Sequence, residues 1–174
     1  MLTFSSLGSG SYKIVGGKKP VIVFPPDRTT DASVLKLASS PEEKKSDDVI
    51  SWPGEYNEYE VSIRGVGHEE GQQISYVVEV DGVRCGCLSS PLREWSDKQL
   101  EAVGDLDVLA IPAEELKLVQ KLVDEFDPRV LFIIPSKEKS DLDAVSKAVG
   151  VRETVNEYKV KSLPAEGREV IVLA

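Results

Sequence analysis

The chain has 174 residues, a length that fits one domain with a sizeable buried core. Hydrophobic residues make up 41% and charged residues 29% of it, the balance of a folded globular protein rather than a disordered one. The net charge of -9 repels the phosphates of nucleic acid and of anionic lipid, so we expect neither nucleic acid nor a membrane as a partner. The sequence also contains no apolar run near the roughly 20 residues of a membrane helix and no signal-peptide pattern.

Short runs of β-branched and aromatic residues, separated by turn residues, predict strands throughout the first half of the chain. These runs are residues 1–4, 11–15, 20–24, 34–38, 49–51, 59–66, 74–80 and 83–88. Gly16-Gly17 and Asp81-Gly82 are typical of tight turns between strands. The charged segment SSPEEKKSDD, residues 39–48, predicts a solvated loop.

Cysteine occurs only at Cys85 and Cys87, within the predicted strand at residues 83–88. A spacing of two places both side chains on one face of the strand, and a disulfide between them is geometrically poor. We therefore expect two small buried thiols and a reduced, cytoplasmic setting.

Helices alternate with strands in the second half. Capped or amphipathic patterns predict helices at residues 96–104, 114–126 and 140–150. Apolar runs at residues 107–113 and 129–135 predict buried strands, and residues 158–174 predict a closing hairpin around Pro164 and Gly167. This order indicates an α/β (α+β) fold of two mixed sheets face to face with outer helices, in a single domain spanning residues 1–174.

Several segments follow one known pattern in the same order. They are FSSLGSGSYKIVGGKKPVIVFPP, PGEYNEYEVSIRGV, VVEVDGVRCGCLSS, DVLAIPA, DPRVLFIIPSKE and SLPAEGREVIVLA. Together they resemble the metallo-β-lactamase superfamily, most closely its small branch of metal-dependent hydrolases, over nearly the whole chain. The resemblance implies a four-layer αββα sandwich with its chemistry at one end of the sheets.

Hydrolases of that family hold one or two divalent metals, zinc or a similar ion, between His and Asp side chains. At the positions of the main cluster, His-x-His-x-Asp-His, this chain has Ser39, Pro41, Glu43 and Lys44. The remaining ligand positions fall on Ser9, Cys87 and Ser90 and near Lys137. The chain has a single histidine, His68, so a histidine-rich metal centre cannot be assembled, and we expect no metal and no other cofactor.

The turn at Trp52, Glu55 and Tyr56 precedes a strand near the active-site side of such a fold. We interpret its aromatic residues first as builders of a structural corner and, with Ser9, as a pocket rim; Glu55 is also a candidate for supporting the site. His68 lies in the segment GVGHEEGQQ and is interpreted as a solvated turn residue.

The leading hypothesis is a non-catalytic protein that keeps the scaffold and has a binding, regulatory or assembly role, with a second copy or another protein as partner. The alternative is an atypical hydrolase whose site is built from Glu43, Glu55, Cys87, Ser90 and Lys137. A third hypothesis is a small-ligand binder that uses the vacated pocket. We also expect Lys44 and Lys137 to fill that pocket in ion pairs with Glu43 or Glu55, because buried charge must be paired.

Overall fold

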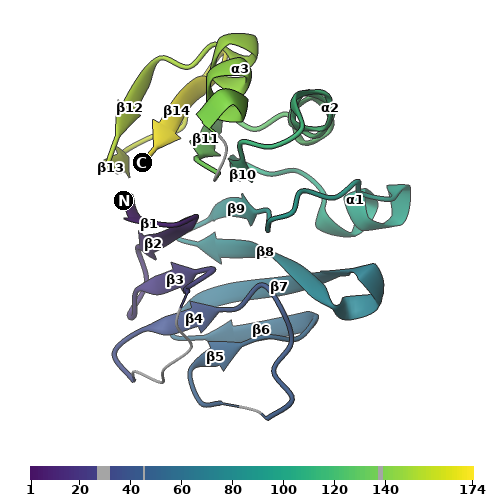
Figure 1. Cartoon of the computed structure of the whole chain (residues 1–174). Coiled ribbons are helices and arrows are strands. Elements are labelled where there is room, and N and C mark those ends of the chain that lie inside the picture. The colour runs from purple at the N-terminus through teal and green to yellow at the C-terminus, as the bar shows by residue number, and fades with distance from the viewer. Residues whose placement is uncertain (27–31, 45, 137–138) are drawn as a thin grey trace.

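In the computed structural model of the chain, which describes residues 1–26, 32–44, 46–136 and 139–174, two mixed sheets pack face to face (Figure 1). The first sheet has six strands, in the order β13 (Glu157–Val160), β1 (Leu2–Gly8), β2 (Ser11–Val15), β3 (Val21–Val23), β4 (Leu35–Leu37) and β5 (Val49–Ile50). Its strands pair antiparallel from β13 to β3 and parallel from β3 to β5.

The second sheet has eight strands, in the order β12 (Glu153–Val155), β14 (Glu169–Leu173), β11 (Val130–Ile134), β10 (Val108–Pro112), β9 (Val83–Cys87), β8 (Gln73–Val80), β7 (Val61–His68) and β6 (Gly54–Glu58). Strands β6 to β9 form an antiparallel meander, with the short 3-10 turn η1 (Glu69–Gly71) between β7 and β8. The strands from β9 to β12 are parallel.

Two hydrophobic cores lie on opposite faces of the eight-stranded sheet, as the alternation of side chains along a strand requires. Tyr76 and Val78 of β8 point into the core between the two sheets, together with Cys85 and Cys87. Val77 points into the second core, beneath α1 (Asp97–Val103), α2 (Leu116–Phe126) and α3 (Lys139–Val149). The prediction that both thiols are buried is confirmed.

The predicted mixed sheets and outer helices are confirmed, and each predicted helix is present to within two residues at either end. All three helices cover the eight-stranded sheet (Figure 1). Within the described residues no helix covers the outer face of the six-stranded sheet, so these residues do not form the fourth layer of the expected αββα arrangement. None of the described helices has the length and apolar composition needed to cross a membrane.

The predicted closing hairpin is wrong, because its two strands belong to different sheets. β13 pairs with β1 in the six-stranded sheet, whereas β14 lies between β11 and β12 in the eight-stranded sheet. The burial of each strand explains the difference. β14 is apolar and buried from Val170 to Leu173, as an inner strand of a parallel sheet must be, whereas only Val160 of the edge strand β13 is buried.

Candidate functional site

The main cluster of metal ligands in the family would follow β4. At that point, hydrogen bonds hold the chain against the opposite sheet. The Tyr76 hydroxyl, from the opposite sheet, donates to Ala38 O at 2.6 Å and contacts Ile50 O at 2.9 Å. The Ile74 N–H donates to Ser39 O at 2.9 Å, which ties the end of β4 to β8.

The four positions of that cluster lie on the surface side of this tie. Ser39 and Pro41 are half-buried, and Glu43 and Lys44 are exposed. Ser9, which matches an early ligand position, is also exposed, in the turn between β1 and β2.

Cys87 occupies another expected ligand position, and it is packed inside the core. Its side chain has no exposed surface, and burial raises the pKa of the thiol to about 12, so it stays protonated at neutral pH. The buried Tyr12 hydroxyl has this thiol beside it, a weak hydrogen-bonding group, and no nitrogen or oxygen partner within the described residues. The Phe24 ring lies 6.4 Å from that of Tyr12 and 6.2 Å from that of Tyr76. Aromatic rings therefore pack the sandwich next to Cys87.

Ser90 is turned toward α2 by a hydrogen bond. Its hydroxyl donates to Glu114 Oε2 at 2.5 Å, and the other oxygen of that carboxylate accepts the Leu92 N–H at 2.8 Å. Lys137 lies outside the described residues. Cys87 therefore lies in the core, Ser90 is hydrogen-bonded to Glu114, and Glu43 and Lys44 lie at the surface.

The turn before β6 makes its own contacts. The Trp52 indole N–H donates to Glu42 O at 3.1 Å, and the Tyr56 hydroxyl donates to Trp52 O at 2.9 Å. Glu55 pairs with Arg64, at 3.6 Å between Oε1 and Nη1. No ion pair between Lys44 and either Glu43 or Glu55 occurs in the described part of the chain. The prediction that Lys44 fills the pocket in such a pair is therefore wrong.

His68 is buried, not solvated, and the sequence-based interpretation of it is wrong. It is the last residue of β7 and only 6% exposed, with Nε2 3.0 Å from Ser75 Oγ and its ring edge-on to Trp95 at 5.0 Å. Burial lowers the pKa of the imidazole, and the Arg93 charge adds to this shift. The alternation through Arg64 and Val66 continues to His68 and could have revealed a residue on the helix-facing side of the sheet.

His68 belongs to a buried polar network that holds the loop between β9 and α1. Ser75 Oγ lies 3.1 Å from Ser89 Oγ and also accepts the Ser89 N–H at 3.1 Å. The Gln73 amide donates to Ser89 Oγ at 2.8 Å and to Pro91 O at 2.7 Å. Arg93 Nε then donates to Gln73 Oε1 at 2.9 Å. Buried polar groups satisfied in this way fix one conformation of the loop.

A cavity of about 610 Å³ lies over this network, between the loop and the starts of α1 and α2. Residues that line it include His68, Arg93, Trp95, Gln99, Glu115 and Leu118. Gln99 closes the capping box of α1 with Ser96 and donates to Gly67 O at 3.0 Å, so this wall of the cavity is tied to β7.

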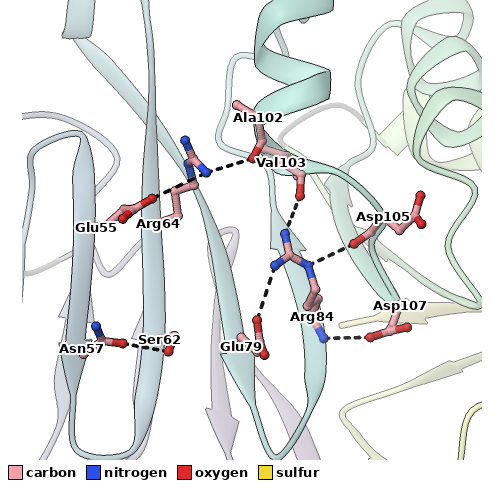
Figure 2. A network of polar contacts seen from close by, with 10 residues as sticks. All are labelled: Glu55, Asn57, Ser62, Arg64, Glu79, Arg84, Ala102, Val103, Asp105 and Asp107. Atoms are coloured by element: carbon pink, nitrogen blue, oxygen red, sulfur yellow. Dashed lines mark hydrogen bonds and ion pairs between the residues drawn. The ribbon is translucent and has the colours of Figure 1, made fainter.

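Two arginines fix the other end of α1, as Figure 2 shows. Arg84 donates to Val103 O and to Asp105 O, the latter at 3.1 Å, and pairs with Glu79 at 3.3 Å. Arg64 donates to Ala102 O at 2.8 Å. Guanidinium groups suit the carboxyl end of a helix, where unpaired carbonyl groups carry partial negative charge.

No protein-family model and no curated protein matches the chain. Among solved structures, it is similar to a protein from Thermotoga maritima described as a Zn-dependent hydrolase of the metallo-β-lactamase superfamily. The TM-score is 0.83 at 23% identity, over 99% of this chain and 98% of that one. The chain has the metallo-β-lactamase fold.

More distant structures share this fold. CmlA, a diiron β-hydroxylase from Streptomyces venezuelae, matches with a TM-score of 0.65 at 9% identity, over 99% of this chain and 52% of its own. Igni18, a metallo hydrolase from Ignicoccus hospitalis, matches with a TM-score of 0.60 at 11% identity, over 92% of this chain and 99% of its own.

The residues of this chain do not fit the metal centre that the metallo-β-lactamase fold implies. A bound divalent ion needs three or four deprotonated or neutral donors that converge on one point. In the described part of the chain no group of three or more His, Cys, Asp or Glu residues is placed to hold an ion. Cys87, the softest candidate donor, is a buried protonated thiol, and His68 points to the other face of the sheet.

Proposed function

We propose that this chain is a metallo-β-lactamase-fold protein that binds a partner, in regulation or assembly, and does not catalyse a reaction. The observation that carries the proposal is the joint replacement of the main ligand cluster by Ser39, Pro41, Glu43 and Lys44, on a scaffold whose two cores are intact. The aromatic packing around the Cys87 thiol supports it, since that space is filled by side chains. We expect the partner to be a second copy of the chain or another protein.

A cytoplasmic location is part of this proposal. Cys85 and Cys87 are unpaired, and burial raises the pKa of both thiols, which suits a reducing compartment.

The alternative, an atypical hydrolase, has less support. A nucleophilic cysteine needs a thiolate and access to substrate, and Cys87 has neither. The Ser90 hydroxyl donates a hydrogen bond to Glu114, and Glu55 is paired with Arg64. Glu43 is exposed, and Lys137 lies outside the described residues.

Metal analysis of untagged protein purified without chelator tests the proposal. We expect zinc, iron and manganese well below one ion per chain, and a thermal unfolding midpoint that neither EDTA nor added zinc changes, because no native-state site is present to be stabilised. A stoichiometric ion in the purified protein, or a midpoint that rises with zinc, would contradict the proposal.

A substrate screen separates the two functions. Esters, phosphodiesters and lactams are tested with the native chain and with the variants Cys87→Ala and Glu43→Gln. Turnover that either variant abolishes would support the hydrolase; we expect none above the buffer rate.

A further inference from the structure

The cavity over His68 lies on the helix-facing side of the eight-stranded sheet, and its lining does not include Ser39, Glu43, Lys44, Cys87 or Ser90. Its volume of about 610 Å³ is in the range of small-molecule sites. An inference about it therefore does not depend on whether those positions bind an ion.

Buried polar residues concentrate beneath this cavity. Of the seven buried polar or charged residues among those described, four belong to the network of His68, Gln73, Ser75 and Ser89. A network that only held the loop would end inside the protein, whereas this one reaches the cavity through His68 and Arg93. His68 Nε2 lies 3.0 Å from Ser75 Oγ, a contact that restrains the ring, and His68 is one of the residues that line the cavity.

The charges that line the cavity favour a cation. Its lining includes three glutamates, Glu69, Glu94 and Glu115, and one arginine, Arg93. The partial positive charge at a helix N-terminus is about half a unit, too small to reverse this excess of negative charge.

One of the three carboxylates has no partner among the residues that the structure describes. Glu69 pairs with Arg93 and Glu94 pairs with Lys121. The Glu115 carboxylate makes no hydrogen bond or ion pair within the described residues, and although it stands at the N-cap of α2, it does not cap that helix. Glu115 is exposed, so its carboxylate is accessible to a ligand.

We infer that this cavity binds a small organic amine, with its ammonium group on Glu115 and its apolar body against Trp95 and Leu118. An anion would meet the excess of carboxylates, and a purely apolar molecule would make no use of the exposed Glu115 carboxylate. The neutral imidazole of His68 supplies a further hydrogen-bonding group for a polar substituent of the ligand.

Titration of the full chain with 2-phenylethylamine, followed by NMR, tests this inference. Because the chain has one histidine and two tryptophans, the His68 ring signals are unique and the Trp95 indole signal need only be distinguished from that of Trp52. We expect the amine to shift the His68 and Trp95 signals and to leave Trp52, which lies outside the cavity, in place. The isosteric probes phenylacetate and 2-phenylethanol are expected to bind roughly tenfold more weakly or not at all.

The variant Glu115→Gln is expected to weaken binding of the amine about tenfold, because it removes one charge-assisted contact. Glu125→Gln makes the same charge change on an exposed residue of the same helix, away from the cavity, and is expected to bind as the native chain does. The inference is overturned if the amine leaves His68 and Trp95 unshifted at about 10 mM, if phenylacetate binds as well as the amine, or if the two variants bind equally.

Discussion

His68 is held neutral by its surroundings, and this has a consequence for stability. Burial lowers the pKa of the imidazole; the Arg93 charge lowers it further, and the Glu69 charge opposes the shift. In the unfolded chain the pKa returns to about 6.5, so the unfolded state takes up a proton at a higher pH than the native state does. The free energy of unfolding therefore falls as the pH is lowered from above 6.5 toward the native pKa.

The variant His68→Gln should remove this part of the pH dependence, since glutamine keeps a hydrogen-bonding group near Ser75 and does not titrate. We expect the native chain to lose stability between about pH 7.5 and 5.5, and the variant to lose clearly less over the same interval. Urea unfolding at several pH values within it measures both. Parallel curves for the two proteins would show that His68 is not the group responsible.

Some features of the site follow from amino-acid composition alone, and others depend on contacts that only the fold creates. A single histidine excludes a histidine-rich metal centre whatever the fold, so the mismatch at Ser39, Pro41 and Lys44 is evident from composition and order. The burial of His68 is not evident, because Gly67 and Glu69 beside it are typical turn residues. Its burial depends on Trp95 and Ser75, which the fold brings to it.

At the level of elements, α1 is a short helix whose position depends on the sheet beneath it. It has seven residues, too few to be stable alone in water. Arg84 of β9 and Arg64 of β7 hold its carboxyl end (Figure 2). The Ser96–Gln99 capping box holds its start.

Replacing Arg84 by Met keeps an apolar stem of similar length and removes three side-chain contacts to Val103, Asp105 and Glu79. We expect a loss of about 1–2 kcal/mol in the free energy of unfolding, because the guanidinium is partly exposed and its bonds are partly screened. Hydrogen exchange should quicken in α1, residues 97–103. Arg64→Met, which removes one bond to the same helix end, is the matched control and should have the smaller effect; an equal effect would count against this account.

Local signals predict the helices well and strand partners poorly. The start of α1 follows from Ser96 and Gln99, residues three apart in the chain. The sequence predicts a corner, not a strand, where β6 lies. The turn that ends β6 has no recognisable signal, because Tyr59 and Glu60 adopt φ values of 51° and 65°, a conformation in which Asn or Gly is usual. The partner of β13 is not predictable locally either, since only packing against β1 decides it.

At the scale of the whole molecule, the two cores share the eight-stranded sheet, and the chain crosses between the sheets after β5, after β12 and after β13. The six-stranded sheet is complete only when β13 joins β1 to β5, and the chain then returns to the eight-stranded sheet as β14. This arrangement favours a single cooperative unfolding transition.

Phe4→Leu in a Trp52→Phe background tests this cooperativity. Phe4 is fully buried between the sheets, 4.6 Å from the Phe132 ring, whereas Trp95 reports from the other core. We expect the substitution to cost about 1–2 kcal/mol and to shift the Trp95 fluorescence transition and the far-UV circular dichroism transition to lower urea by the same amount. A Trp95 transition that does not move would indicate two independently unfolding cores.

The pairing of β1 with β13 also sets an order of events during synthesis. Leu2 lies opposite Val160, so β1 finds its outer neighbour only after the strands from β2 to β12 have been synthesised. Until then the β1 edge offers free N–H and C=O groups to any other nascent chain nearby. Completion of the six-stranded sheet is thus a late, long-range step, which slows folding and lengthens the period in which chaperones are useful.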